Sequence, residues 1–305
     1  MTRPHPFDTV VPLPRDDTAP SVSNETAQGA LHWAPVQDSG LAARMRTIVD
    51  WIATARPSAV VVDVSVEVAT LIRLLGVPVI VVAMPGQRTD PPHDWVYRLA
   101  DHILACWPRE LYEPTWLKPH REKVSYIGGV SRFDGRDRST ARRGGSAGKR
   151  RVAVLGGAGG SALDLSSVRG CAADLPDYEW QALGVSTGTW VQDPWPDLCA
   201  ADVVVAHAGE SSVADLATAE KAAIIVPAPR PFDEQEITGA LLARAGLAVV
   251  QPHWPLPVEW PDLLHRARSI DGKRWRRWRT AGASQRAAAA IEGVAARYSE
   301  GIGVR

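Results

Sequence analysis

Residues 201–216 read ADVVVAHAGESSVADL and contain the pattern that decides the fold. The β-branched run Asp202–Ala206 predicts a buried strand that leads to His207, and a helix is expected over Ser211–Ala219. Gly209 between them allows a sharp turn. A strand that passes through a short turn into a helix is the repeating unit of a parallel α/β sheet. The beginning of such a helix presents unpaired N–H groups and the positive end of its dipole, which favour an anion such as a diphosphate.

The same alternation of short apolar runs and amphipathic stretches continues on both sides of these residues. Two such series predict two α/β sheets, with ligands at the carboxyl ends of the strands in a cleft between the halves. The further expected strands are Ser58–Asp63, Val77–Ala83, Lys123–Ile127, Arg151–Leu155, Trp180–Gly184, Ala222–Val226 and Leu247–Val250. The further expected helices cover Leu41–Ala55, a segment ending at Leu75, a segment from about Trp95, and Glu234–Ala245.

The domain boundaries follow from composition. Residues 131–150, SRFDGRDRSTARRGGSAGKR, have almost no aliphatic side chains and many Gly, Ser and Arg, which predicts a linker. It separates an N-terminal α/β domain, residues 31–130, from a C-terminal α/β domain, residues 151–305. Residues 1–30 mix Pro, Asp, Thr and Ser and are expected to form an extended or disordered arm.

Composition excludes several classes of protein. The chain has 305 residues, 45% of them hydrophobic, so it can bury a sizeable core and is not wholly disordered. Its 34 basic and 34 acidic residues cancel, so no global field attracts nucleic acid, and no nucleic-acid partner is expected. The three cysteines form no CxxC or Cys/His pattern, which argues against a disulfide framework and a zinc site. With no signal peptide or membrane span visible, a cytoplasmic location is expected.

A second motif, VLGGAGGS at residues 154–161, leads from a strand into glycines. Their missing side chains would let backbone N–H groups approach a phosphate closely. The segment is not a Walker-type GxxxxGK[ST] loop, which argues against an NTPase. A plain turn between strand and helix explains the glycines equally well. The glycines concerned are Gly156, Gly157, Gly159 and Gly160.

A third motif follows the strand predicted at Ala222–Val226, in the loop PAPRPFDEQ at residues 227–235. Glu234 and Gln235 carry both acceptor and donor groups and could bind sugar hydroxyls. The competing interpretation is a simple capped helix start. The competing interpretation of residues 201–216 is that Ser211 or Ser212 merely caps the helix and that His207 is a turn histidine with its hydrogen bonds satisfied. Three polar loops at one sheet edge favour the ligand site.

The segment from His207 to Gln235, HAGESSVADLATAEKAAIIVPAPRPFDEQ, resembles the donor-binding domain of GT-B glycosyltransferases. The nearest pattern is that of the family 28 C-terminal domain and of the macrolide and UDP-glucuronosyl groups. The resemblance implies two Rossmann-like domains. It implies that the C-terminal domain binds a nucleotide-sugar, with these roles: His207, Gly209, Ser211 and Ser212 on the diphosphate, Asp215 on the ribose, Glu234 and Gln235 on the sugar, Val191 at the base, and the glycine loop facing the leaving phosphate.

Two departures from the family pattern matter. The ribose position is commonly Glu, whereas this chain has the shorter Asp215. The family also opens with a strand and a loop containing Gly and His, which this chain lacks. We therefore expect an incomplete N-terminal domain, either because the chain is truncated or because it is naturally reduced, and a truncated chain would be inactive.

The resulting functional prediction is an inverting, metal-independent glycosyltransferase with a UDP or TDP sugar donor, an unidentified small or lipid-linked acceptor and no cofactor. The alternatives are a GT-B-fold nucleotide-sugar epimerase or hydrolase, and a non-catalytic nucleotide-sugar-binding protein. Asp63 and Asp90 are the candidate general bases, although a lone Asp63 also fits a strand-end cap. Arg88 is a candidate contact on the acceptor side. The basic run Lys273–Arg279 fits either peripheral contact with anionic lipid or, preferably, solvated arginines on a terminal helix.

Overall fold

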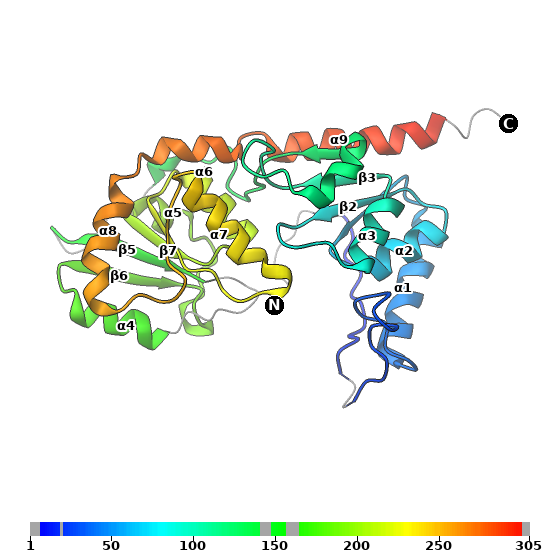
Figure 1. The fold of residues 1–305 in the computed structure, drawn as a ribbon, viewed down its shortest axis with the longest axis horizontal. Helices are drawn as coiled ribbons and strands as arrows, with labels where there is room; N and C mark the ends of the chain where they lie inside the picture. Colours follow the sequence, from blue (N-terminus) through cyan, green and yellow to red (C-terminus); the bar gives the residue numbers. More distant parts are fainter. Residues whose placement is uncertain (1–6, 19–20, 141–147, 157–164, 301–305) are drawn as a thin grey trace. The chain divides into compact units, whose positions relative to one another are not determined.

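A computed structural model describes residues 7–18, 21–140, 148–156 and 165–300 (Figure 1). By their internal contacts these residues form two compact units. The first takes in the described residues up to Val82, together with Thr89–Ile103 and the residues from Ile291 onwards. The second takes in Ala83–Arg88 and Leu104–Ala290. The division assigns Leu104–Ala290 to the second unit, and the domain boundaries expected from composition remain a prediction.

The first sheet has four strands in the order β1-β2-β3-β4. Strands β1 and β2 are parallel, with Val60 opposite Val79, as expected for a strand, helix, strand unit. The elements of this part of the chain are α1 (Ser39–Ala55), β1 (Val60–Asp63), α2 (Val66–Leu74), β2 (Val79–Ala83), α3 (Pro91–Leu99), β3 (His102–Ala105), the 3₁₀ helix η1 (Thr115–Lys123) and β4 (Val124–Tyr126).

Local sequence explains the ends of these helices. Asp38 caps α1 by accepting a hydrogen bond from the Leu41 backbone N–H at 2.6 Å, and α1 ends at Arg56 in the left-handed conformation before Pro57. Helix α3 begins at Pro91, four residues before the expected start, because Asp90 takes the cap position and two prolines suit the first helical turn.

The second sheet has five parallel strands in the order β6-β5-β7-β8-β9. This order and direction confirm the α/β class expected from the alternating pattern. The elements of this part of the chain are β5 (Arg150–Leu155), α4 (Leu165–Asp174), β6 (Tyr178–Leu183), α5 (Trp195–Ala200), β7 (Val203–Ala206), α6 (Glu210–Ala219), β8 (Ala223–Ile225), α7 (Glu234–Arg244), β9 (Val249–Val250), α8 (Trp260–Ser269) and α9 (Ala283–Glu300), with five 3₁₀ helices, η2 (Arg138–Thr140), η3 (Thr187–Thr189), η4 (Pro231–Asp233), η5 (Pro257–Glu259) and η6 (Gly272–Trp278).

One core cluster of this sheet joins strand residues to α4 and α8. Val154 and Val205 of the strands pack with Cys171 of α4 and with Trp260 and Leu264 of α8, all nearly inaccessible to solvent. Because β5, β7 and β8 are parallel and adjacent, the loops that follow them emerge at one edge of the sheet. None of the helices in the described ranges is long and apolar enough to cross a membrane.

Candidate functional site

The turn after β5 is closed by a backbone contact that only glycine permits. The N–H of Gly156 donates to Leu183 O at 2.8 Å, and a Cβ built on Gly156 would lie 2.3 Å from the carbonyl oxygen of Gly184. Gly156 is therefore required for the close approach of the two strand ends. Gly157, Gly159 and Gly160, which the sequence suggests for phosphate contact, lie outside the described residues.

His207 follows β7 and is held in one orientation. Its Nδ1 lies 2.6 Å from the carbonyl oxygen of Val226, and only 7% of the residue is exposed. A carbonyl can only accept, so Nδ1 carries the proton and donates it to Val226. His207 also borders a pocket of about 550 Å³, which it shares with Glu236, His253 and Trp254. His207, the predicted phosphate ligand, is thus held in one orientation at the carboxyl end of β7.

Helix α6 begins at the same edge without a side-chain cap. Gly209 occupies the cap position with extended dihedral angles, so the suggestion that Ser211 or Ser212 caps this helix is wrong. Ser211 is exposed and Ser212 half-buried, both in the first turn. Gly209, as the cap residue, has no side chain that could accept a hydrogen bond from the first turn. The N–H groups of that turn point beyond the start of the helix, as an anion site requires.

Gln235, at the start of α7, ties two of these loops together. Its Oε1 accepts hydrogen bonds from the backbone N–H groups of Ala208 at 3.1 Å and Ala228 at 2.9 Å, and 5% of the residue is exposed. Its amide nitrogen lies 3.7 Å from the position a Cβ on Gly209 would occupy. The side chain suggested for sugar binding therefore aligns the turn after β7 with the loop after β8, and its amide faces the start of α6.

Glu234 and Arg88, predicted for different substrates, form one ion pair within the second unit. Arg88 donates to Glu234 Oε2 at 3.0 Å, is 4% exposed, and stacks on the Phe232 ring with its guanidinium 4.6 Å from the ring centroid. Gln87 donates from its backbone to Phe232 O at 2.8 Å and from its side chain to Asp233 at 2.9 Å. Arg88 thus fastens residues 85–88 to the loop that precedes α7.

Asp215, the predicted ribose ligand, lies on α6 with 3% of the residue exposed. Ser131 donates to its Oδ1 at 2.8 Å, and Arg132 approaches Oδ2 at 3.3 Å. Burial raises the pKa of Asp215, and the contacts with Ser131 and Arg132 partly oppose the rise. The sequence did not suggest these partners, because they lie in the predicted linker. In the described structure the carboxylate joins that segment to α6.

Val191, predicted at the base-binding edge, is half-buried in the loop between β6 and α5. Its neighbour Trp190 is 48% exposed. This loop returns toward the turn after β5, because Thr189 O accepts a hydrogen bond from Gly184 N at 2.8 Å. Val191 therefore belongs to a loop on the same sheet edge as Gly156 and His207.

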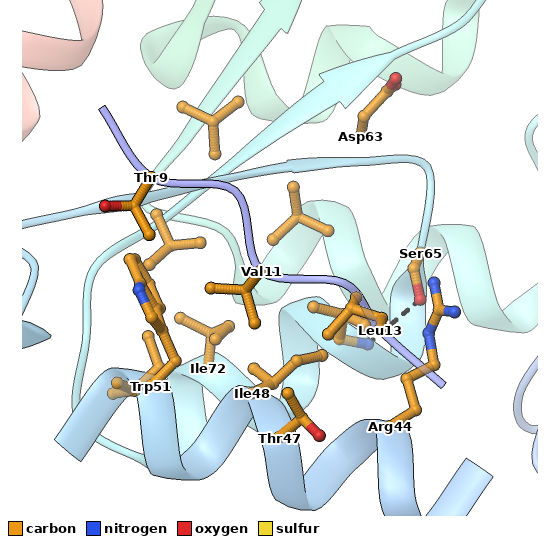
Figure 2. A pocket seen from close by; sticks show the side chains of 15 residues that line it. Thr9, Val11, Leu13, Arg44, Thr47, Ile48, Trp51, Asp63, Ser65 and Ile72 are labelled. Carbon is orange, nitrogen blue, oxygen red and sulfur yellow. Dashed lines mark hydrogen bonds between the residues drawn. The ribbon is translucent and has the colours of Figure 1, made fainter. Parts of the chain in front are cut away.

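The candidate bases are both in the first unit but differ in environment. Asp63 ends β1, is exposed, and is one of the residues that line a pocket of about 400 Å³ between β1 and α1 (Figure 2). Burial of its carboxylate raises its pKa. Asp90 contacts two histidines that sequence reasoning missed: His32 Nε2 at 2.7 Å and His93 Nδ1 at 2.5 Å. Burial alone would raise the pKa of Asp90, but these hydrogen bonds outweigh it and lower the pKa. The spacing of Asp90 and His93, three residues apart at a helix start, was a visible signal.

The basic run Lys273–Arg279 forms the 3₁₀ helix η6, and several of its arginines have partners within the second unit. Arg277 donates to Ala245 O at 2.8 Å, and Arg274 lies near Gly246 O at 3.4 Å, at the end of α7. Arg276 pairs with Glu220 at 3.0 Å at the end of α6. Arg274 and Arg277 therefore contact carbonyl groups at the end of α7, and the arginines of the run are exposed, as expected for solvated side chains.

A family model described as the glycosyltransferase family 28 C-terminal domain matches residues 177–256. The chain is similar to the UDP-N-acetylglucosamine--N-acetylmuramyl-(pentapeptide) pyrophosphoryl-undecaprenol N-acetylglucosamine transferase of Methylococcus capsulatus, with 29% identity over 210 residues, 59% of this chain and 54% of the relative. The protein of the same name from Marinobacter nauticus is 26% identical over 196 residues, 56% of this chain and 51% of the relative. The chain thus spans about half the length of the curated relatives it matches.

Solved structures resemble the fold over most of the chain. The glycotransferase of kitacinnamycin superposes with a TM-score of 0.62 and 18% identity over 83% of this chain and 80% of that one. MurG of Acinetobacter baumannii superposes with a TM-score of 0.56 and 16% identity over 82% of this chain and 77% of that one. These likenesses confirm the GT-B fold, and the family match includes the segment on which the resemblance was predicted. Residues 177–256 therefore match the glycosyltransferase family 28 C-terminal domain, within a chain that has the GT-B fold.

Proposed function

We propose that this chain transfers a sugar from a nucleoside-diphosphate sugar to a hydroxyl of an acceptor. The observation that carries the proposal is the edge of the second sheet, where the fixed His207 lies next to the start of α6 and the cap residue Gly209 places no side chain over that helix end. Fixed donors at a helix start stabilise the negative charge that develops on a departing diphosphate. The match of this segment to a glycosyltransferase domain supports the same conclusion.

The proposed reaction is a single displacement that inverts the anomeric carbon. The acceptor oxygen forms a bond to that carbon as the bond to the diphosphate oxygen breaks, and the nucleoside diphosphate leaves with the bonding electrons. A base takes the acceptor proton. The dipole of α6 would offset the charge of the diphosphate, and the His207 ring would add to this when Nε2 also carries a proton, because Nδ1–H is already donated to Val226 O. We therefore propose that transfer needs no metal ion at this site.

The donor and acceptor are inferred from the names of the relatives. Both curated relatives are named for UDP-N-acetylglucosamine and a pyrophosphoryl-undecaprenol substrate. We propose a UDP sugar as donor, with a TDP sugar as the alternative, and a lipid-linked acceptor at the cytoplasmic face of a membrane. The proposed ligands are the residues named from the family pattern, with Gln235 acting chiefly through its amide nitrogen because Oε1 already accepts two backbone hydrogen bonds.

Asp63 is the better supported of the two candidate bases. Its carboxylate is exposed and has a raised pKa, which brings it closer to the operating pH expected of a general base. Asp90 has both carboxylate oxygens engaged with histidines. Replacing Asp63 with Asn should therefore abolish transfer while nucleotide binding persists.

Calorimetric titration of the full chain with UDP-N-acetylglucosamine, UDP and TDP-glucose tests donor binding. His207→Ala should make the free energy of donor binding less favourable by about 1–3 kcal/mol, the scale of a lost charge-assisted hydrogen bond. The matched control is His265→Ala, an exposed histidine on α8 that should leave affinity unchanged. Equal affinity in the His207 variant and the parent protein would reject the assignment.

Release of UDP from the donor separates the remaining alternatives. Release that depends on an added undecaprenyl-linked acceptor, with a glycosylated product, supports transfer. Release without acceptor indicates a hydrolase, and conversion of the donor sugar without UDP release indicates an epimerase. Binding without any turnover, in the presence of acceptor, indicates a nucleotide-sugar-binding protein and contradicts the proposed activity.

A further inference from the structure

Three potential metal ligands come together in the first unit, and none of them is a proposed donor ligand. His32 lies in the turns before α1, Asp90 is the cap residue of α3, and His93 lies in the first turn of that helix. One carboxylate oxygen of Asp90 lies 2.7 Å from His32 Nε2 and the other 2.5 Å from His93 Nδ1. The two imidazole rings have centroids 4.6 Å apart. Two histidines and one aspartate therefore converge on a single point.

The ligand atoms of the three side chains all lie within 4.8 Å of one another. Metal–nitrogen and metal–oxygen bonds of about 2.0–2.2 Å in a tetrahedral site place neighbouring ligand atoms roughly 3.3 Å apart. Each of the two short contacts to Asp90 would have to open by less than about 1 Å to admit an ion. The widest separation in the set, up to 4.8 Å, would have to close by about 1.5 Å, which side-chain rotations would have to supply.

Burial suits the same arrangement. The His93 side chain is 6% exposed, which shields one side of the cluster, whereas His32 and Asp90 are 27% and 28% exposed. An ion held there would have protein on one side and water on the other. Glu67 does not compete for it, because its oxygens accept the backbone N–H groups of His32 and Trp33 and the Ser65 hydroxyl. Glu67 instead holds the turn that carries His32.

We propose that His32, Asp90 and His93 bind a divalent transition-metal ion, with Zn²⁺ the best fit. Two imidazole nitrogens and one carboxylate match zinc chemistry, whereas Mg²⁺ and Ca²⁺ prefer sets made only of oxygen ligands. Water fills the open fourth position. The ion connects residues that are 58 positions apart in the chain, so it fastens the turn before α1 to the beginning of α3. Its role is to stabilise the first unit, and no step of sugar transfer depends on it.

The test uses the full, untagged chain, stripped with a chelator and titrated with Zn²⁺ in a calorimeter. We expect one ion per chain and a higher unfolding temperature in its presence, because a ligand that binds only the folded state stabilises it. Titration with Co²⁺ should produce the intense visible bands of a four- or five-coordinate site with nitrogen ligands. A stoichiometry well below one, or a Co²⁺ spectrum identical to that of the aqueous ion, would overturn the proposal.

Variants locate the ion. His32→Gln replaces a partly exposed ligand and should weaken Zn²⁺ binding at least tenfold and remove the thermal shift, with far-ultraviolet circular dichroism unchanged. Asp90→Asn provides a second variant if His32→Gln fails to fold. His265→Gln on α8 is the matched control and should bind as the parent protein does. Parent-like binding in the folded His32 or Asp90 variant would mean that the ion sits elsewhere and that the three side chains form only a hydrogen-bonded network.

Discussion

Two regions are held in place by different kinds of contact: the loops at the carboxyl ends of the strands in the second sheet, and the surroundings of the edge strand β1 in the first sheet. At the second sheet, backbone and buried polar groups determine the geometry, as in the Gly156 contact with Gly184 and the two hydrogen bonds to Gln235. At the first sheet, strand β1 pairs only with β2 among the described residues, and the pocket beside it is lined by α1 and by the chain segment Thr9–Leu13.

Figure 2 shows that segment crossing between α1 and β1, with Val11 and Leu13 directed among the apolar side chains. Both nevertheless remain 37–38% exposed, and a pocket of about 400 Å³ persists. The hydrogen bonds and backbone contacts at the second sheet are directional and allow one geometry, whereas the partly exposed apolar side chains of Thr9–Leu13 can pack against α1 and β1 in several ways. Substitutions should therefore cost far more at the second sheet than at the first.

The largest effect is expected for Gly156→Ala. Its Cβ would lie 2.3 Å from Gly184 O and 2.8 Å from Val185 Cα, both backbone atoms, so β5 and β6 must separate. We expect a loss of about 3 kcal/mol or more in the free energy of unfolding, measured by urea denaturation. Gly209→Ala is the matched control, because its Cβ meets nothing closer than 3.7 Å at a φ of −66° and should cost about 0.5 kcal/mol or less. Equal losses in the two variants would contradict this account.

The next largest effect is expected for Gln235→Ala. The change leaves the buried N–H groups of Ala208 and Ala228 without their acceptor, which should cost about 2–4 kcal/mol of unfolding free energy. Gln235→Glu retains an acceptor oxygen and should recover most of that loss. Gln181→Ala, on the exposed face of β6, serves as control and should be nearly neutral. A neutral Gln235→Ala variant would show that water replaces the amide.

A smaller effect is expected for Glu234→Gln, which removes the carboxylate that the buried Arg88 contacts at 3.0 Å. The loss should be about 1–3 kcal/mol, because Arg88 is 4% exposed and Glu234 only 20%, so solvent screens the pair weakly. Glu113→Gln breaks the Arg109–Glu113 contact, whose side chains are 57% and 33% exposed, and should have no measurable effect. Thermal unfolding of both variants side by side checks the difference.

This contrast also explains what the sequence could predict. The β-branched runs before Asp63 and His207 predicted β1 and β7, because both are short, apolar and bounded by turn residues. Strand β3, with only Ile103, Leu104 and Ala105 as its apolar residues, was too short for a periodic signal and was missed. Helices α4, α5 and α8 were also not predicted, although the buried residues of α8, Trp260, Leu263, Leu264 and Ala267, recur at helical spacing and could have revealed it.

Side-chain roles depended on distant partners and were harder to predict. The pattern of residues 207–235 identified the family, but the partners of Arg88 and Asp215 lie 146 and 84 positions away in the chain. His32 was overlooked because nothing in its surroundings suggests chemistry, and only the fold brings it to Asp90. Local propensity predicts elements, whereas these contacts depend on tertiary packing.

The smallest effect is expected at the outer edge of the first sheet, for Asp63→Asn. Desolvation raises the folded-state pKa of Asp63 above its unfolded value, so the folded state binds the proton more tightly and stability falls as pH rises through that interval. The Asn variant has no carboxyl group at residue 63 and so lacks this pH dependence. Its free energy of unfolding relative to the parent should rise with pH from about 4 upward, by less than about 1 kcal/mol because the residue is exposed. Thermal unfolding over a series of pH values measures it.

Val11→Ser connects that pH trend to the loose apolar cover. Val11 lines the same pocket as Asp63, and a hydroxyl there would admit water to the pocket and reduce any desolvation that the segment Thr9–Leu13 causes at residue 63. The advantage of Asn over Asp at residue 63 should therefore be smaller in the Val11→Ser background than in the parent. An unchanged advantage would mean that β1 and α1 alone desolvate Asp63. In that case the segment Thr9–Leu13 would have no part in setting its pKa, and the outer edge of the first sheet would be more tightly packed than the exposure of Val11 indicates.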